Sequence, residues 1–118
     1  MNRNYLIIIV LMLFISCEEI INEQNIEPEE VTIIAPSQRS IVASGSVNFH
    51  WDPVDGASSY RIQIANPNFQ RAAQVVVDST TSATRESFPL ETGSYQWRVR
   101  AENSAYVTDY VVIDFEVQ

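Results

Sequence analysis

The sequence predicts an all-β domain built as a sandwich of two sheets, and three observations support this prediction. From residue 31 onward, apolar and polar residues alternate with a period of two in several short runs, as in strands with one buried face. Turn residues separate these runs roughly every dozen positions. No run has the apolar period of a helix. Short strands with one apolar face each favour two sheets packed over a shared core.

Seven strands are expected, and turn signals set their limits. They lie near residues 31–34, 47–51, 60–64, 74–78, 85–88, 95–102 and 110–117. Pro36 ends the first strand because proline cannot donate a ladder hydrogen bond. Asp52-Pro53 ends the second strand, and Asp55-Gly56 makes the turn into the third. These limits leave room for short strands only.

The last two strands also predict a register. Trp97 and Phe115 belong to the inward sets of their strands, whereas Arg98 and Asp114 belong to the outward sets. We expect Trp97 opposite Phe115 and Arg98 opposite Asp114 in an antiparallel pair. A shift of one residue would expose Phe115 and bury Asp114, whereas a shift of two would preserve the faces.

Three segments of this predicted sandwich resemble the fibronectin type III domain. They are Phe49-His50-Trp51 with Pro53 after it, the run from Gly56 to Ile64, and the run from Leu90 to Asn103. The resemblance covers residues 31–118 and implies a seven-stranded, immunoglobulin-like (fibronectin type III-like) β-sandwich. It implies a central core position for Trp51 and a tyrosine corner at Tyr95, whose hydroxyl would bond to the backbone upstream. The same scaffold serves many unrelated roles, so the resemblance predicts fold rather than function.

The N-terminal residues have the features of a secretory signal. Arg3 precedes an apolar run from Tyr5 to Ile15, which is too short to span a hydrocarbon core of about 30 Å. Leu13-Phe14-Ile15-Ser16-Cys17 resembles the lipobox of bacterial lipoproteins. This resemblance implies a signal peptide over residues 1–16 and acylation of Cys17, which would anchor the protein to a membrane. An ordinary secretory signal with an incidental cysteine and an uncleaved N-terminal anchor are the alternatives.

Residues 17–30 are expected to form an acidic linker between the lipid and the domain. Six of the thirteen residues from 18 to 30 are glutamates, and their repulsion together with Pro28 favours an extended, solvated spacer. Acids directly after the cysteine also resemble the surface-export signal of lipoproteins in Bacteroidota, although a plain flexible tether is equally consistent with them. The expected location is therefore the cell envelope, with the protein lipid-anchored at the outer membrane; exposure at the cell surface is left open.

Charge and composition exclude several function classes. The chain has 7 basic residues, none of them lysine, against 15 acids, and its net charge of -8 argues against nucleic acid as a partner. One cysteine excludes a disulfide framework and a cysteine-rich zinc site. No phosphate-binding loop, dinucleotide fingerprint, zinc-protease or EF-hand motif occurs. We therefore expect no cofactor, no metal site and no enzymatic activity.

Few residues are candidates for chemistry. His50 is the only side chain that titrates near neutrality, and we interpret it as a strand residue rather than a base or ligand. Two carboxylate pairs, Asp52 with Asp55 and Asp109 with Asp114, are candidates for a glycosidase. The first pair is ordinary turn chemistry, and a sandwich filled by its own core has no cleft for a sugar.

Three arginines, Arg61, Arg98 and Arg100, are expected to point outward from neighbouring strands. A basic stripe of this kind could bind an anionic polymer. The nearby Asp114 and Glu116 favour an ion-paired, solvated sheet face instead.

The loops at one end of the sandwich are the expected contact surface. The turn at 52–59 and the loop at 103–109 should lie at the same end. Tyr106 and Asn103 are the candidate binding residues there, suited to a sugar or a protein, unless Tyr106 packs on its own domain. The sequence thus predicts a lipid-anchored, non-catalytic binding module of the cell envelope that contacts a glycan or an envelope protein. The alternative is a structural spacer or an accessory subunit of an outer-membrane assembly with no small ligand.

Overall fold

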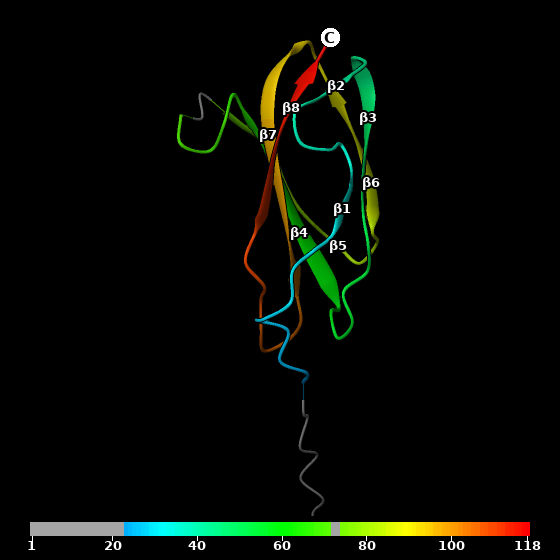
Figure 1. Cartoon of the computed structure of the whole chain (residues 1–118), viewed down its shortest axis with the longest axis vertical. Helices are drawn as coiled ribbons and strands as arrows, with labels where there is room; N and C mark the ends of the chain where they lie inside the picture. Colours follow the sequence, from blue (N-terminus) through cyan, green and yellow to red (C-terminus); the bar gives the residue numbers. More distant parts are fainter. Residues whose placement is uncertain (1–22, 72–73) are drawn as a thin grey trace, which may run out of the picture.

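The computed structural model describes residues 23–71 and 74–118, which form two β-sheets (Figure 1). The strands are β1 (Ile33–Ala35), β2 (Ser40–Val42), β3 (Gly45–Trp51), β4 (Ser59–Asn66), β5 (Gln74–Thr81), β6 (Arg85–Leu90), β7 (Gly93–Glu102) and β8 (Val111–Val117). One sheet has the order β1-β3-β6, and the other has the order β2-β8-β7-β4-β5. The predicted all-β sandwich is confirmed.

The structure has eight strands where the sequence predicted seven. The additional strand is β2, which pairs in parallel with β8 through Ser40, Ile41 and Val42. It was missed because three residues at a sheet edge are too short to show an alternating pattern, and Ile41 is in fact exposed. The first predicted strand, 31–34, is observed as β1 at Ile33–Ala35.

Within the part of the chain that the structure describes, no helix is long and apolar enough to cross a membrane. The predicted signal peptide at 1–16 and the predicted lipidation site at Cys17 lie outside the described residues.

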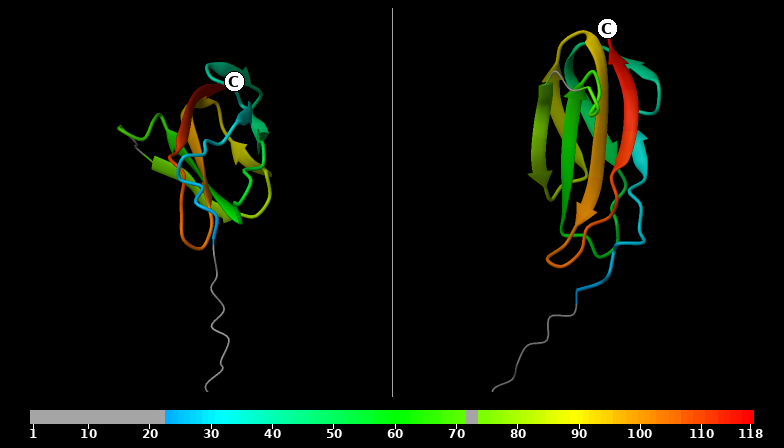
Figure 2. Two further views of the ribbon diagram at one scale, coloured as in Figure 1. Left: turned by 60° about the horizontal axis from the view of Figure 1, so that its bottom comes forward. Right: turned by 90° about the vertical axis from the view of Figure 1, so that its left-hand side faces the viewer.

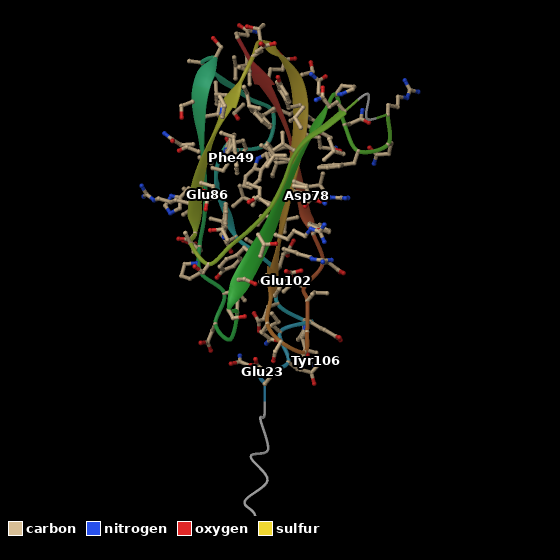
Figure 3. All side chains as sticks on the ribbon, turned by 180° about the vertical axis from the view of Figure 1, so that it is seen from behind. Glu23, Phe49, Asp78, Glu86, Glu102 and Tyr106 are labelled. Atoms are coloured by element: carbon tan, nitrogen blue, oxygen red, sulfur yellow. The ribbon has the colours of Figure 1, made fainter. Side chains whose placement is uncertain are left out.

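Aromatic rings fill the space between the two sheets. Phe49, Trp51 and Trp97 are fully buried, and Figure 3 shows Phe49 between the layers. The Phe49 ring meets Trp97 edge-on, with 5.0 Å between centroids, and Trp51 meets Tyr60 in a similar way at 5.6 Å. Such contacts contribute about 0.5–1.5 kcal/mol each beyond area burial. The central position predicted for Trp51 is confirmed.

The predicted tyrosine corner is also present. The Tyr95 hydroxyl donates to the backbone carbonyl of Glu91 at 2.8 Å, four residues upstream. This bond fixes the turn between β6 and β7, because it ties the start of β7 to the residue that follows β6.

The predicted register of β7 and β8 is wrong by two residues. The observed pairs are Tyr95 with Phe115, Gln96 with Asp114 and Trp97 with Ile113. The inward and outward faces are nevertheless as predicted, because a period of two distinguishes faces but cannot distinguish registers that differ by two. Side-chain contacts favour the observed register: the Tyr95 ring stacks on Phe115, and Gln96 donates to Asp114 at 2.9 Å.

The folded unit begins before residue 31, so the solvated linker predicted over 17–30 is too long. Ile26 is fully buried and belongs to the core cluster, as does Val31. The acids around Ile26 concealed it, because one apolar residue among glutamates has no periodic partner in the sequence. The chain is therefore held to the domain from Glu23 onward by Ile26 in the core, although residues 27–30 are exposed.

Candidate functional site

The first candidate region is the base, which we define as the turn 52–58, the loop 103–109 and the segment 23–30. Figure 3 shows Glu23 and Tyr106 together at this end. The Ser58 amide donates to the Glu102 carbonyl at 2.8 Å, and the Asn103 side chain donates to the Gly56 carbonyl at 3.1 Å. The prediction that the turn and the loop lie at the same end is confirmed.

The segment 23–30 is fastened across the base, and in both views of Figure 2 it lies next to the loop that follows β7. The Asn103 amide donates to the Gln24 carbonyl at 2.8 Å. The Ser104 hydroxyl donates to the Glu23 carboxylate. Gly56 has a φ of 85°, which favours glycine, and a Cβ there would lie 2.7 Å from the end of the Gln24 side chain and displace it.

The two predicted binding residues of the base take part in its internal structure. Asn103 uses both ends of its amide, because its Oδ1 accepts from the backbone amides of Ala105 and Tyr106 while its Nδ2 donates as described above. Tyr106 is half-buried and packs against the core cluster. In the structure, Asn103 therefore bonds the segment 23–30 to the loop 103–109, and the Tyr106 ring packs against its own domain.

His50 lies half-buried on β3, opposite Ala35 and Arg85. It lines a hollow of about 370 Å³ on the three-stranded sheet together with Asn48 and Glu86. This setting is that of a strand residue, as the sequence indicated.

The predicted carboxylate pairs do not form one site. Asp52, Asp55 and Asp109 are exposed, whereas Asp114 accepts hydrogen bonds from Gln96 and Gln38 on the sheet face. Within residues 23–71 and 74–118, no three histidine, cysteine or acidic side chains gather as metal ligands would.

The outer face of the five-stranded sheet carries the three arginines. Arg61 makes two hydrogen bonds of 2.9 Å to Asp78, and this interaction lowers the pKa of the Asp78 carboxyl. Arg100 pairs with Glu102 at 2.8 Å. The expected ion-paired face is present, but its acids are Asp78 and Glu102 rather than those on β8.

Arg98 is held by aromatic rings rather than by a carboxylate. Its guanidinium lies 4.0 Å from the Phe69 ring centroid and 4.5 Å from that of Tyr110. Its Nε donates to Gln63 at 2.8 Å. Cation–π contacts of this kind hold the Arg98 side chain in place, so its positive charge interacts with rings of the same domain.

After the base and the sheet face, the remaining region is the distal end. It lies opposite the base, where the C-terminal residue is found (Figure 1). A hollow of about 740 Å³ opens here between the two sheets, and we call it the distal hollow. Its polar lining side chains are Ser44, Asn66, Gln74, Glu91 and Thr92. The sequence did not predict this hollow, because its residues come from five strands, β3 to β7, and from two connecting turns, and they share no motif.

Comparisons with known proteins bear on the fold alone. No family model matches the chain, and no curated protein matches it. Among solved structures, the chain is similar to the fibronectin(III)-like modules of CbhA from Clostridium thermocellum, with a TM-score of 0.55 and 13% identity over 75% of this chain and 96% of that one. It is similar to FN3tt with a TM-score of 0.54 and 16% identity, covering 78% of this chain and 92% of that one.

A third solved structure, CopC from Methylosinus trichosporium OB3b, gives a TM-score of 0.50 and 17% identity over 75% of this chain and 94% of that one. These similarities define the class: the domain is a fibronectin type III-like β-sandwich.

Proposed function

We propose that this protein is a lipid-anchored, non-catalytic module of the cell envelope, held to a membrane through Cys17 and contacting a glycan or protein partner. The lipobox-like sequence that ends at Cys17 supports the anchor. The filled aromatic core and the ion-paired sheet face support a module without catalytic chemistry.

The observation that carries the proposal is the contrast between the two ends of the sandwich. The chain enters the domain at the base, where Glu23 and Gln24 are fastened to the loop 103–109. Five residues separate Cys17 from Glu23, so an anchored chain would hold the base within about 20 Å of the membrane. The distal end would then face away from the membrane and towards a partner.

A structural spacer is the second candidate. It is favoured by the arrangement of the chain, because β8 finishes at the end of the sandwich opposite the segment 23–30 (Figure 1). A spacer needs its two attachment points far apart, and this arrangement provides them. A spacer and a binding module differ in whether the distal end makes a specific, saturable contact.

The anchor is tested by mass spectrometry of the N-terminal peptide and by membrane fractionation. We expect an acylated Cys17 peptide, recovery of the wild-type chain in the membrane fraction, and surface proteolysis in intact cells. The Cys17→Ser variant should lack the acyl group and leave the membrane fraction. An unmodified Cys17 in a mature, soluble protein would exclude the proposed anchoring.

A further inference from the structure

A β-bulge in β5 brings Gln74 to the same face as Asn66, which lies on β4 in phase with the inward Ile62 and Ile64. Ile64 pairs with Val77 and Ala65 pairs with Val75, so that one extra residue of β5, Val76, lies between them. A bulge of this kind changes the phase of the strand and redirects the side chains beyond it. Beyond the bulge, Asn66 pairs directly with Gln74, and both side chains line the hollow.

Hydrogen bonds to backbone carbonyls hold the rest of the rim in place. The Tyr95 hydroxyl fixes the Glu91 carbonyl, and with it the turn that carries Thr92. On the opposite side, the Ser44 amide donates to the Gln118 carbonyl at 2.9 Å. A rim that is ordered before binding loses little conformational entropy when a ligand arrives.

The polar groups of this rim are free for a ligand, in contrast to those of the base. Among the residues that the structure describes, the side chains of Asn66, Gln74 and Thr92 make no hydrogen bond to the protein, whereas Asn103 makes four. An amide side chain donates and accepts at once, and a hydroxyl does the same. Such groups match the hydroxyls of a sugar, each of which is both donor and acceptor.

The floor of the distal hollow is apolar. Leu90, Val76 and the buried Tyr95 lie beneath the polar rim. Sugar rings present C–H faces as well as hydroxyls, so a polar rim around an apolar floor suits them. The volume of about 740 Å³ lies within the range of roughly 300–1,000 Å³ that is typical of small-ligand pockets.

Charge argues against an anionic ligand. Among the described residues that line the hollow, Glu91 is the one charged group, and it is acidic. The chain as a whole carries a net charge of -8. A carboxylate and a negative protein both oppose the approach of a sulfated or uronic glycan.

We infer that the distal hollow binds the end of a neutral glycan, with Asn66, Gln74 and Thr92 as the residues that hydrogen-bond its hydroxyls. This inference rests on the proposed function, because it names the ligand class of a binding module. It places recognition at the end opposite the predicted residues Tyr106 and Asn103.

The test is an NMR titration of the full chain, purified with its N-terminus intact in detergent micelles. The probes are maltose, cellobiose, xylobiose, mannobiose and chitobiose, with a sulfated heparin disaccharide as the anionic probe. We expect saturable shifts of the amide signals around the distal hollow with at least one neutral disaccharide, and none with the sulfated one.

A double variant and a matched control locate the site. In Gln74→Ala/Thr92→Val, the loss of two hydrogen bonds should weaken binding about tenfold or more. The control Gln118→Ala/Thr80→Val makes the same chemical changes at exposed positions outside the hollow and should bind as the wild type does. Thermal unfolding midpoints equal to that of the wild type show that both variants keep the fold.

Four outcomes would overturn the inference: no shift with any disaccharide, equal weakening in both double variants, a preference for the sulfated probe, or shifts confined to the base. These outcomes are separate from the test of the anchor. If Cys17 is acylated but no disaccharide binds, only the glycan inference is wrong. If a disaccharide binds but the mature chain carries no acyl group, only the proposed anchor is wrong.

Discussion

The base and the distal end of this sandwich use the same kinds of polar side chain in opposite ways. At the base, Asn103 bonds to Gln24, Gly56, Ala105 and Tyr106, so its amide serves the fold. At the distal end, Asn66 lines a hollow and has no such partners among the described residues. The contrast teaches that a polar loop residue indicates a binding site only when its hydrogen bonds are not already used within the fold.

The largest effect is expected at Ile26, which fixes the segment 23–30 to the core. The Ile26→Ala substitution removes a fully buried side chain and should lower the free energy of unfolding by about 2–4 kcal/mol. Ile34 is 46% exposed and serves as the control, since Ile34→Ala should cost well under about 1 kcal/mol. Urea unfolding measures both. Equal losses at the two positions would mean that the segment is not part of the folded unit.

The same substitution at both ends tests the contrast between them. Asn103→Ala should lower the free energy of unfolding by about 1–3 kcal/mol, because it leaves two half-buried backbone groups without partners. Asn66→Ala should cost less than about 0.5 kcal/mol, because the Asn66 side chain makes no hydrogen bond to another described residue. Urea unfolding of the two variants measures the difference, and a larger loss at Asn66 would contradict the proposed roles.

Tyr95 links the core to the rim of the distal hollow. Tyr95→Phe keeps the ring that stacks on Phe115 and removes the bond to the Glu91 carbonyl. We expect a loss of about 1 kcal/mol in the free energy of unfolding and faster hydrogen exchange at Thr92. Tyr106→Phe is the matched control, with a change close to zero. Unchanged exchange at Thr92 in Tyr95→Phe would show that the hydroxyl does not order the rim.

The smallest effect concerns the ion pair on the sheet face. Arg61 lowers the pKa of Asp78 in the folded state, so the stabilisation is present above the unfolded pKa of about 3.9 and is lost as the pH falls through the folded value. Both side chains are about two-fifths exposed, and salt screens the pair. The difference in stability between wild type and Asp78→Asn should therefore shrink in acid and in high salt. If the stability difference between the two proteins did not change with pH or with salt, packing rather than the ion pair would explain it.

The sequence predicted those parts of the structure that a two-residue period controls. The inward faces of Phe49, Trp51 and Trp97 follow from alternation and are observed. The register of β7 with β8 does not follow from it, because pairings that differ by two residues bury the same side chains. Likewise, β2 is too short to show a period.

The site was harder to predict than the fold, because it depends on contacts between distant residues. Asn103 is a polar loop residue of a type that often binds ligands. Only its hydrogen bond to Gln24, 79 positions away, reveals its structural role. Asn66 continues the inward period of Ile62 and Ile64, whereas Gln74 faces the distal hollow because of a bulge in β5 that no sequence pattern indicates. Ile26 could have been noticed as the lone apolar residue in the acidic segment at 23–30, but its burial depends on the three-dimensional arrangement.

The most direct test of the contrast between the ends is photo-crosslinking in cells from a photoreactive residue at either end. Position 92 reports on the distal hollow, and position 105 reports on the exposed surface of the base. We expect position 92 to capture an envelope glycan or glycoconjugate and position 105 to capture none. Capture from position 105 alone would contradict this expectation and would return the contact surface to the loop 103–109.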